Sequence, residues 1–262
     1  MKLCDKKLFL LDMDGTLYLG DRLFDCTREF LSHIRNMGAK YLFLTNNSSK
    51  SAAAYTEKLA KMGIEANEDD FFTSTDATAL YLKNKYNNSL IYASGTHTFT
   101  EELRSYGLNI TIEPQAGIKC FVMGYDTELT YEKLNVASRL LTDKSIDYVA
   151  TNPDLVCPTE YGYVPDCGSV AAMLFNATGR KPKFIGKPEP EMIYESMRRQ
   201  SATKEETVII GDRLYTDIAA GVNAGVDTVF VLSGEGTKSD IEKYKIKPTY
   251  VLRDVGEVFS RN

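Results

Sequence analysis

Residues 7–16 read KLFLLDMDGT, and this stretch decides the fold class. One lysine precedes four apolar residues in a row, a pattern typical of a strand buried on both faces of a parallel sheet. The apolar run ends at Asp12, and Asp14, Gly15 and Thr16 follow within four residues. Because ligands bind beyond the carboxyl ends of the strands in open parallel sheets, we expect a functional site to begin at Asp12.

Strand and helix patterns alternate along most of the chain. Apolar strands are predicted at 41–44, 184–185, 208–210 and 229–232, with amphipathic helices at 24–37, 51–62, 189–199 and 214–223. This alternation predicts an α/β fold with a Rossmann-like, doubly wound parallel sheet. The middle of the chain has strand and helix signals of its own and is large enough for a domain. We therefore predict a core domain of residues 1–84 plus 181–262 and an inserted α/β domain of residues 85–180.

Composition and charge limit the classes of partner. The chain has 262 residues and a formal net charge of −5, so it has no general electrostatic attraction to nucleic acid or anionic membranes. We expect no nucleic-acid polymer and no membrane as partner, and an anionic ligand must be bound locally. No apolar stretch approaches the ~20 residues of a membrane span. The five cysteines lack metal-ligand spacing, which favours a cytoplasmic protein.

Polar residues follow four predicted strands at once. If the sheet is parallel, all four strand ends meet at one edge and bring these residues together. They are Asp12 and Asp14, then Thr45, Asn46 and Asn47, then Lys187, and finally Asp212 with Asp217 shortly after it.

This set of side chains suits a magnesium and phosphate site. Asp12 and Asp212 supply carboxylate oxygens, which Mg²⁺ prefers together with water and substrate phosphate. Thr45 and the backbone N–H groups after it are donors, and Lys187 is a cation, for the charge that spreads over a phosphoryl group in transfer. An aspartate such as Asp12 can attack phosphorus directly. Asp14 could protonate the leaving alcohol and then activate water.

The ordered motifs resemble those of the haloacid dehalogenase (HAD) superfamily. Residues 12–16 are similar to its first motif, Thr45 to the second, Lys187 to the third, and residues 211–217 to the fourth. The resemblance implies a phosphoric monoester hydrolase with Mg²⁺ as cofactor and an aspartyl-phosphate intermediate. The roles that it implies are as follows: Asp12 as nucleophile and metal ligand, Asp14 as general acid/base and metal ligand through its backbone carbonyl, Thr45 and Asn46 as phosphate ligands with Asn47 nearby, Lys187 as the neutralising cation, Asp212 as metal ligand and Asp217 as its support.

The position of the inserted segment is similar to that of the C2-capped branch, and specifically of the NagD-like and 4-nitrophenyl-phosphatase-like group. TNNS at 45–48, TNPD at 151–154, PDCG at 165–168 and GKPEP at 186–190 carry this similarity. It implies a C2-type cap that closes over a small-molecule phosphate monoester, such as a nucleotide or sugar phosphate. It also implies a homodimer through the cap, although the sequence itself identifies no interface.

Three cap residues are candidates for substrate contact. Asn152 and Asp154 either contact substrate or form a turn around Pro153. Cys157 stands where pyridoxal phosphate phosphatases of the resembling group carry a histidine, which disfavours that specialisation.

Other interpretations of the same residues stay open. Thr45 and Asn46 are also good helix-capping residues, and Lys187 by itself could be a surface charge. A phosphotransferase or mutase would use the same core residues. A catalytically silent regulator that binds a phosphate ligand would keep the fold but lose at least one of the aspartates.

Overall fold

A computed structural model of the chain describes residues 2–159 and 161–259. The chain forms two compact units. The first comprises Met1–Thr45, Ala52–Phe72 and Lys187–Asn262, and the second comprises Asn46–Ser51 and Thr73–Gly186. Among the described residues, no helix combines the length and the apolar character needed to cross a membrane.

These units differ from the predicted domains at both boundaries. Helix α3 (Ser74–Tyr86) belongs to the second unit, where its last residue, Tyr86, donates a hydrogen bond to Asp147 Oδ2 at 2.7 Å. Strand β12 (Lys183–Phe184) also belongs there, because it pairs with β9 (Asp147–Ala150). Contacts made far along the chain therefore decide the boundaries, and a local pattern of helix and strand does not reveal them.

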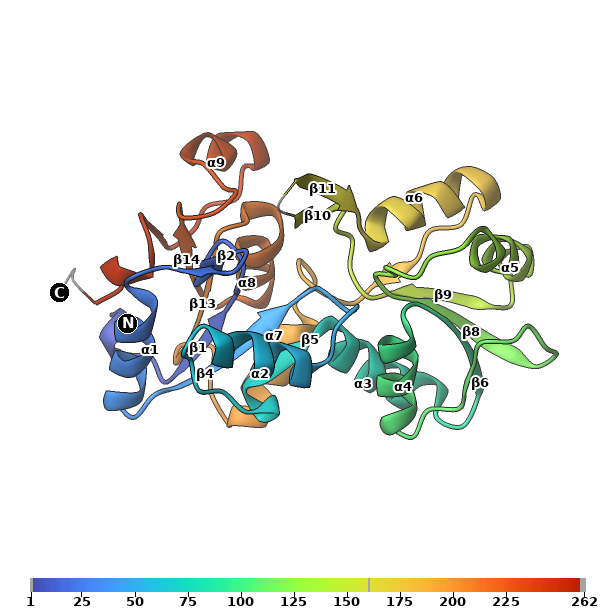
Figure 1. Cartoon of the computed structure of the whole chain (residues 1–262), viewed down its shortest axis with the longest axis horizontal. Helices are drawn as coiled ribbons and strands as arrows, with labels where there is room; N and C mark the ends of the chain where they lie inside the picture. The colour runs from blue at the N-terminus through green and yellow to red at the C-terminus, as the bar shows by residue number, and fades with distance from the viewer. Residues whose placement is uncertain (1, 160, 260–262) are drawn as a thin grey trace. The chain divides into compact units, whose positions relative to one another are not determined.

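The first unit is built on a six-stranded sheet with the order β15-β14-β13-β1-β4-β5 (Figure 1). The registered pairs β1–β4, β1–β13, β13–β14 and β14–β15 are all parallel. The chain leaves β1 in one direction through β4 and β5 and returns to its other side through β13. The strand order thus reverses beside β1, which is where ligands bind in such sheets. The strands are β1 (Leu8–Leu11), β4 (Lys40–Thr45), β5 (Phe71–Thr73), β13 (Thr207–Gly211), β14 (Asp227–Val231) and β15 (Tyr250–Leu252).

Helices cover both faces of this sheet. Phe9 of β1 and Ile210 of β13 share a buried cluster with Phe30 of α1 and Tyr55 of α2. The neighbouring residue Ile209 points to the opposite face, where it lies against α8. The two central strands are buried along their whole length, as the uninterrupted apolar pattern predicts. The helices are α1 (Thr27–Asn36), α2 (Ala52–Lys61), α7 (Glu191–Gln200), α8 (Ala219–Ala224) and α9 (Lys238–Tyr244).

Short elements complete the first unit. A two-stranded hairpin follows the loop after β1, which begins at Asp12, and a π-helical turn leads into α8. They are β2 (Tyr18–Leu19), β3 (Arg22–Leu23), the π-helical turn Leu214–Ile218, and the 3₁₀ turns Leu3–Asp5, Glu68–Asp70 and Val255–Glu257.

The second unit has its own sheet, in the order β12-β9-β8-β6-β7, and every pair in it is parallel. Helices α5 and α6 pack on it through a buried cluster that includes Phe121, Val136 and Leu174. An antiparallel hairpin, β10–β11, precedes α6. The remaining elements are β6 (Leu90–Ser94), β7 (Ile110–Thr111), β8 (Ile118–Met123), β10 (Val156–Thr159), β11 (Gly162–Pro165), α4 (His97–Ser105), α5 (Tyr131–Leu141) and α6 (Cys167–Thr178).

Candidate active site

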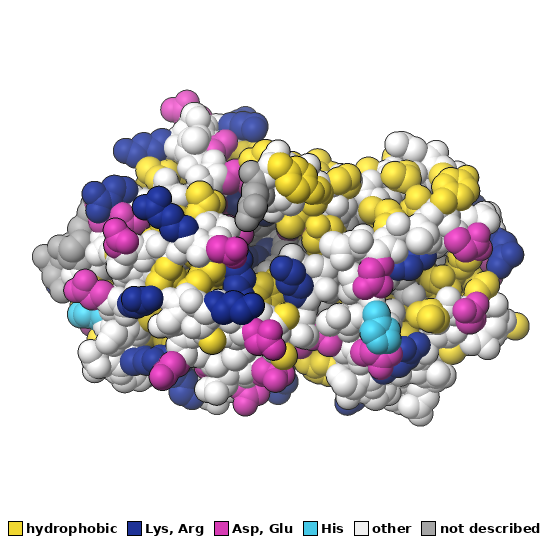
Figure 2. Space-filling model, viewed as in Figure 1, with side chains coloured by type: hydrophobic (Ala, Val, Ile, Leu, Met, Phe, Trp, Pro, Cys, Tyr) yellow, Lys and Arg dark blue, Asp and Glu magenta, His cyan; other side chains and the backbone are white. Residues whose placement is uncertain are grey.

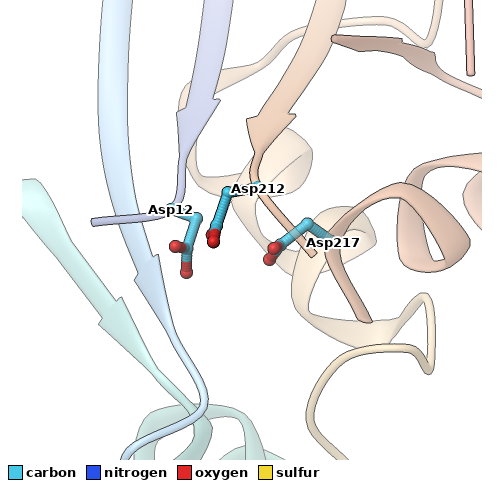
Figure 3. A group of neighbouring side chains, drawn as sticks. All are labelled: Asp12, Asp212 and Asp217. Atoms are coloured by element: carbon cyan, nitrogen blue, oxygen red, sulfur yellow. The ribbon is translucent and has the colours of Figure 1, made fainter. Parts of the chain in front are cut away.

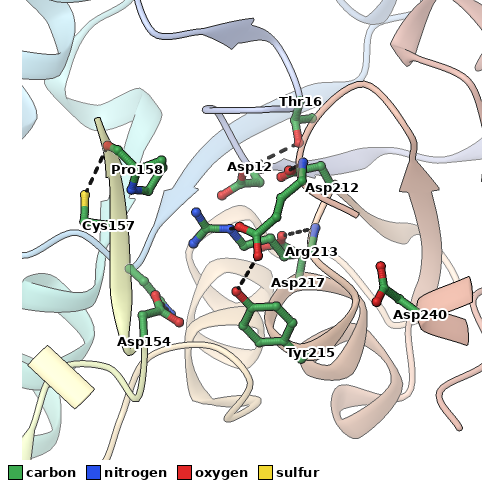
Figure 4. A network of polar contacts seen from close by, with 12 residues as sticks. Asp12, Thr16, Asp154, Cys157, Pro158, Asp212, Arg213, Tyr215, Asp217 and Asp240 are labelled. Atoms are coloured by element: carbon green, nitrogen blue, oxygen red, sulfur yellow. Dashed lines mark hydrogen bonds and ion pairs between the residues drawn. The ribbon is translucent and has the colours of Figure 1, made fainter. Parts of the chain in front are cut away.

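Asp12 is fixed at the point where β1 ends. Its backbone N–H donates to the carbonyl of Ile210 at 2.9 Å, which continues the pairing of β1 with β13 by one residue. The hydroxyl of Thr16 lies 3.5 Å from Asp12 Oδ2 (Figure 4). Between them, Gly15 has a φ of +85°, and a Cβ there would lie 2.3 Å from Asp212 Oδ2. Only glycine fits this turn, because it tolerates the left-handed backbone and leaves room for Asp212.

Lys187 joins two of the carboxylates. Its Nζ donates to Asp12 Oδ1 at 2.8 Å, to Asp217 Oδ1 at 2.5 Å and to the carbonyl of Leu44 at 3.2 Å. The lysine side chain is only 2% exposed, so these bonds replace its hydration. Burial disfavours the ammonium form, but the carboxylates of Asp12 and Asp217 outweigh burial and raise the pKa of Lys187 above its ordinary value. Lys187 is therefore a buried permanent cation.

Three carboxylates meet at the carboxyl ends of β1 and β13. Asp12 follows β1, Asp212 follows β13, and Asp217 lies in the π-helical turn (Figure 3). One oxygen of each lies within 4.8 Å of one oxygen of each of the others. Burial and the negative charge of Asp217 raise the pKa of Asp12 to about 8 and that of Asp212 to about 7. Burial is the larger cause of both shifts, and the attraction of Lys187 only partly offsets it at Asp12.

The hydrogen bonds distinguish the carboxylates by their capacity to hold a cation. Asp217 accepts from Lys187 at Oδ1 and from the backbone N–H of Arg213 at Oδ2, at 2.5 and 3.2 Å. The contact of Asp12 Oδ2 with the Thr16 hydroxyl is longer, at 3.5 Å. In contrast, Asp212 Oδ1 is buried and has no hydrogen-bond partner among the described residues. An unpaired buried carboxylate oxygen beside two further carboxylates fits a divalent cation. Asp12 and Asp212 are thus the side chains best placed to hold Mg²⁺, while Asp217 holds Lys187.

Asp14 and Thr45, the other core residues predicted for the site, make different contacts from the three carboxylates. Asp14 is half-buried, and its Oδ1 accepts a bond from the backbone N–H of Gly20 at 3.4 Å. Thr45 is the last residue of β4 and is 8% exposed. It follows directly after Leu44, whose carbonyl accepts from Lys187.

The predicted phosphate ligands Asn46 and Asn47 belong to the second unit. Asn46 Nδ2 donates to Asp154 Oδ2 at 3.0 Å, and the Asn46 carbonyl accepts from Asn152 Nδ2 at 2.7 Å. Asn47 Oδ1 accepts from the backbone N–H of Ser49 at 2.9 Å. These hydrogen bonds join both side chains to other residues of the second unit.

The three predicted cap residues have different environments. Asn152 and Asp154 are 0% and 6% exposed, and the Asp154 N–H donates to Asn152 Oδ1 at 3.1 Å. They form a turn that holds Asn46, which corresponds to the turn interpretation of the TNPD sequence. Cys157 lies in β10, half-buried, with its thiol 3.8 Å from the carbonyl of Pro158.

One set of residues escaped the sequence analysis. After β14, the backbone N–H of Glu235 donates to Asp212 Oδ2 at 2.7 Å, and Ser233 Oγ donates to the carbonyl of Gly15 at 2.7 Å. The signal was present, because residues 233–236 read SGEG directly after an apolar strand. The rule that pointed to the other four strand ends applies equally to this one.

Similarities to known proteins agree with this geometry. A family model described as haloacid dehalogenase-like hydrolase matches residues 9–109, and one described as HAD-hydrolase-like matches residues 184–258. The acid sugar phosphatase of Staphylococcus epidermidis is 36% identical over 247 residues, which are 94% of either chain.

Two solved structures extend the comparison. The 4-nitrophenylphosphatase of Thermotoga maritima has a TM-score of 0.92 and 38% identity, and the match covers 98% of this chain and 97% of that one. The glycerol phosphate phosphatase of Mycobacterium tuberculosis, solved in complex with magnesium, also has a TM-score of 0.92, with 28% identity over 98% of this chain and 78% of that one.

Proposed function

The chain belongs to the haloacid dehalogenase-like hydrolases, and from this premise we propose that Asp12 is the nucleophile of a Mg²⁺-dependent phosphatase. As a phosphatase of that family, the protein needs a nucleophile, a general acid, and positive charge that offsets the negative charge of the phosphate. One observation carries the proposal: Lys187 holds Asp12 Oδ1 at 2.8 Å beside Asp212, whose buried Oδ1 has no partner among the described residues.

The reaction proceeds in two steps. Asp12 attacks phosphorus, the bond from phosphorus to the substrate oxygen breaks, and Asp14 gives its proton to that oxygen. In the second step Asp14 takes a proton from water, and the resulting hydroxide attacks phosphorus and releases Asp12 and inorganic phosphate.

Binding of the phosphate falls to the groups around Asp12. Lys187 orients Asp12 and lowers its pKa, and Thr45 with the main-chain N–H groups of Asn46 and Asn47 binds phosphate oxygens. The carboxylates of Asp12 and Asp212 and the Asp14 carbonyl would hold Mg²⁺, which would supply positive charge against the transferred phosphoryl group.

Sugar phosphates are the proposed substrate class. The support comes from the relatives, since one is named an acid sugar phosphatase and another a glycerol phosphate phosphatase. Small polyol phosphates have poor leaving groups, so they depend on Asp14 as the acid. The compound 4-nitrophenyl phosphate, named for a third relative, has a good leaving group and serves as a probe.

Paired substitutions test this mechanism. Asp12→Asn should abolish release of phosphate from every substrate, whereas Asp14→Asn should slow sugar phosphates far more than 4-nitrophenyl phosphate. Asp21→Asn is the matched control, because the Asp21 side chain is 87% exposed. Phosphate release would be measured with and without Mg²⁺. Full turnover by Asp12→Asn would exclude the aspartyl-phosphate route, and turnover independent of Mg²⁺ would exclude the metal.

We also propose that two copies of the chain pair through the second unit. Figure 2 shows hydrophobic side chains gathered over β10, β11 and α6. Helix α6 carries no charged residue over Cys167–Thr178. Exposed apolar surface of this kind favours a protein partner. The exposed residues of this α6–hairpin patch are Leu155, Val156, Tyr161, Tyr163, Met173 and Phe175.

Sedimentation tests the pairing. Met173→Glu should convert a dimer to a monomer, because the charge would be buried in the interface. Ile112→Glu is the control, since Ile112 is exposed to a similar extent, 51% against 52%, outside the patch. A wild-type monomer at micromolar concentration, or a dimer unaffected by Met173→Glu, would refute the proposed interface.

A further inference from the structure

We propose that the loop of residues 233–236 fixes Asp212 so that this carboxylate offers a divalent cation one oxygen only, Oδ1. The inference rests on the proposed function, because the cation is the one assigned to that reaction. The loop follows β14, and its entry is held by the backbone N–H of Leu232, which donates to the carbonyl of Leu252 at 3.1 Å.

The loop occupies the other oxygen of Asp212. The backbone N–H of Glu235 donates to Oδ2 at 2.7 Å, the length of a strong bond to a carboxylate. Gly234 packs so closely that a Cβ there would lie 2.0 Å from the same oxygen. Gly236 leaves equally little room, with a Cβ position 2.2 Å from the Asp212 carbonyl oxygen. Oδ2 is therefore enclosed, whereas Oδ1 lacks a hydrogen-bond partner among the described residues.

Side chains hold the loop in this position from two directions. Ser233 Oγ donates to the carbonyl of Gly15 at 2.7 Å, which links the loop to the Asp12 turn. The Glu235 carboxylate accepts from Tyr215 OH at 3.1 Å and pairs with Arg213 Nε at 3.0 Å. Arg213 and Tyr215 come from the turn that also carries Asp217. Glu235, Arg213 and Tyr215 are positioning residues, since they act on the cation site through Asp212.

A carboxylate held in this way can discriminate between cations. Mg²⁺ requires near-octahedral geometry with short bonds to single oxygens, whereas Ca²⁺ accepts more ligands and often takes both oxygens of a carboxylate. Because Oδ2 is enclosed, Asp212 cannot bind a cation through both carboxylate oxygens. The loop therefore favours Mg²⁺ over Ca²⁺, and loosening it should reduce that preference.

Metal titration without substrate tests the inference. Glu235→Ala keeps the N–H donor and the Ser233 bond but removes the contacts with Tyr215 and Arg213, and Tyr215→Phe removes only the first of these two contacts. Loss of groups that orient a ligand lowers metal affinity by about 10- to 100-fold, so we expect about a tenfold loss of Mg²⁺ affinity in Glu235→Ala and a smaller loss in Tyr215→Phe. Ca²⁺ affinity should change less. The control is Tyr244→Phe, because the Tyr244 ring contacts Tyr215 in a tilted arrangement with centroids 5.6 Å apart.

Calorimetry with Mg²⁺ and Ca²⁺ gives the affinities, and thermal unfolding without metal reports the stability of each variant. A lower ratio of Mg²⁺ to Ca²⁺ affinity in Glu235→Ala, or in Tyr215→Phe if Glu235→Ala does not fold, supports the inference. Equal losses for both cations, or no loss in either variant, overturn it while wild-type hydrolysis stands. If wild-type protein binds no Mg²⁺ and releases no phosphate, the proposed function fails as well.

Discussion

Replacement of Lys187 by methionine tests how the buried charges are balanced. Methionine matches the length of the side chain but removes the ammonium group that Asp12 and Asp217 share at 2.8 and 2.5 Å. With all groups ionised, Asp12, Asp212, Asp217 and Lys187 sum to −3 + 1 = −2, and the variant site would hold −3.

The magnitude follows from burial. Removal of one partner from a buried ion pair costs about 3–5 kcal/mol, which is a factor of about 10² to 10⁴ in the folding equilibrium. The loss should depend on pH. The pKa of Asp12 is raised to about 8, so at pH 5 its carboxyl holds a proton and loses only a hydrogen bond when Lys187 is gone, whereas the pair of Lys187 with Asp217 at 2.5 Å is lost at either pH. We therefore expect a smaller loss at pH 5 than above pH 8, where the full loss applies.

Urea unfolding of metal-free protein at pH 5 and pH 8.5, followed by circular dichroism, measures both values. Lys85→Met is the control, because Lys85 pairs with Asp147 at 3.0 Å on the surface, where such pairs contribute about 0–1 kcal/mol. Added Mg²⁺ should restore more stability to Lys187→Met than to wild type, since the variant site is more negative. A loss that is the same at both pH values, or no greater than that of Lys85→Met, would refute this account of the charges.

Three further outcomes follow from the same geometry. Gly15→Ala should lower Mg²⁺ affinity, because its Cβ displaces Asp212. The control is Gly20→Ala, which has φ +60° and open space around it and should cost only about 1–2 kcal/mol of stability. Equal Mg²⁺ affinities of the two variants would contradict this prediction. Metal-free protein should lose stability as pH rises from 5 to 8, because the folded Asp12 and Asp212 keep protons that the unfolded chain releases near pH 4; urea midpoints that rise over this window would contradict the raised pKa values. Asn152→Ala should lower the unfolding free energy by about 1–3 kcal/mol, because it removes a buried donor, and unchanged stability with a raised KM would instead indicate substrate contact.

The fold class was predictable because it depends on short, local patterns. Uninterrupted apolar runs such as residues 8–11 indicated buried parallel strands, and the structure confirms the α/β fold. The match to a solved 4-nitrophenylphosphatase confirms the resemblance to that group. The unit boundaries were not predictable in this way. Distant bonds such as that of Tyr86 to Asp147 assign helix α3 to the second unit, and they join residues 61 positions apart in the chain.

The candidate site also combines features that local sequence predicts with features that depend on distant contacts. Position after a strand is a local property, so Asp12, Lys187 and Asp212 were found together. The engagement of single oxygens is not local, because it depends on residues far away in the chain. Lys187 is 30 residues from Asp217 and 175 from Asp12, and Glu235 is 23 residues from Asp212. For this reason the sequence could not show that Asp217 is committed to Lys187, or that Asp212 is held by the loop after β14.

The charges also explain why a cation and Lys187 are both needed. The metal-free site has a formal charge of −2 when its carboxyls are ionised, so it repels a phosphate monoester, which is itself a dianion near neutral pH. A divalent cation brings the sum to zero, and neither Lys187 nor the cation achieves this alone. Lys187 lowers the pKa of Asp12, but burial and Asp217 still hold it at about 8, so metal-free Asp12 keeps a proton near neutral pH, and a protonated carboxyl is a poor nucleophile. The lysine and a divalent cation together would therefore favour the ionised form of Asp12, and the cation would make the ionised site acceptable to an anionic substrate.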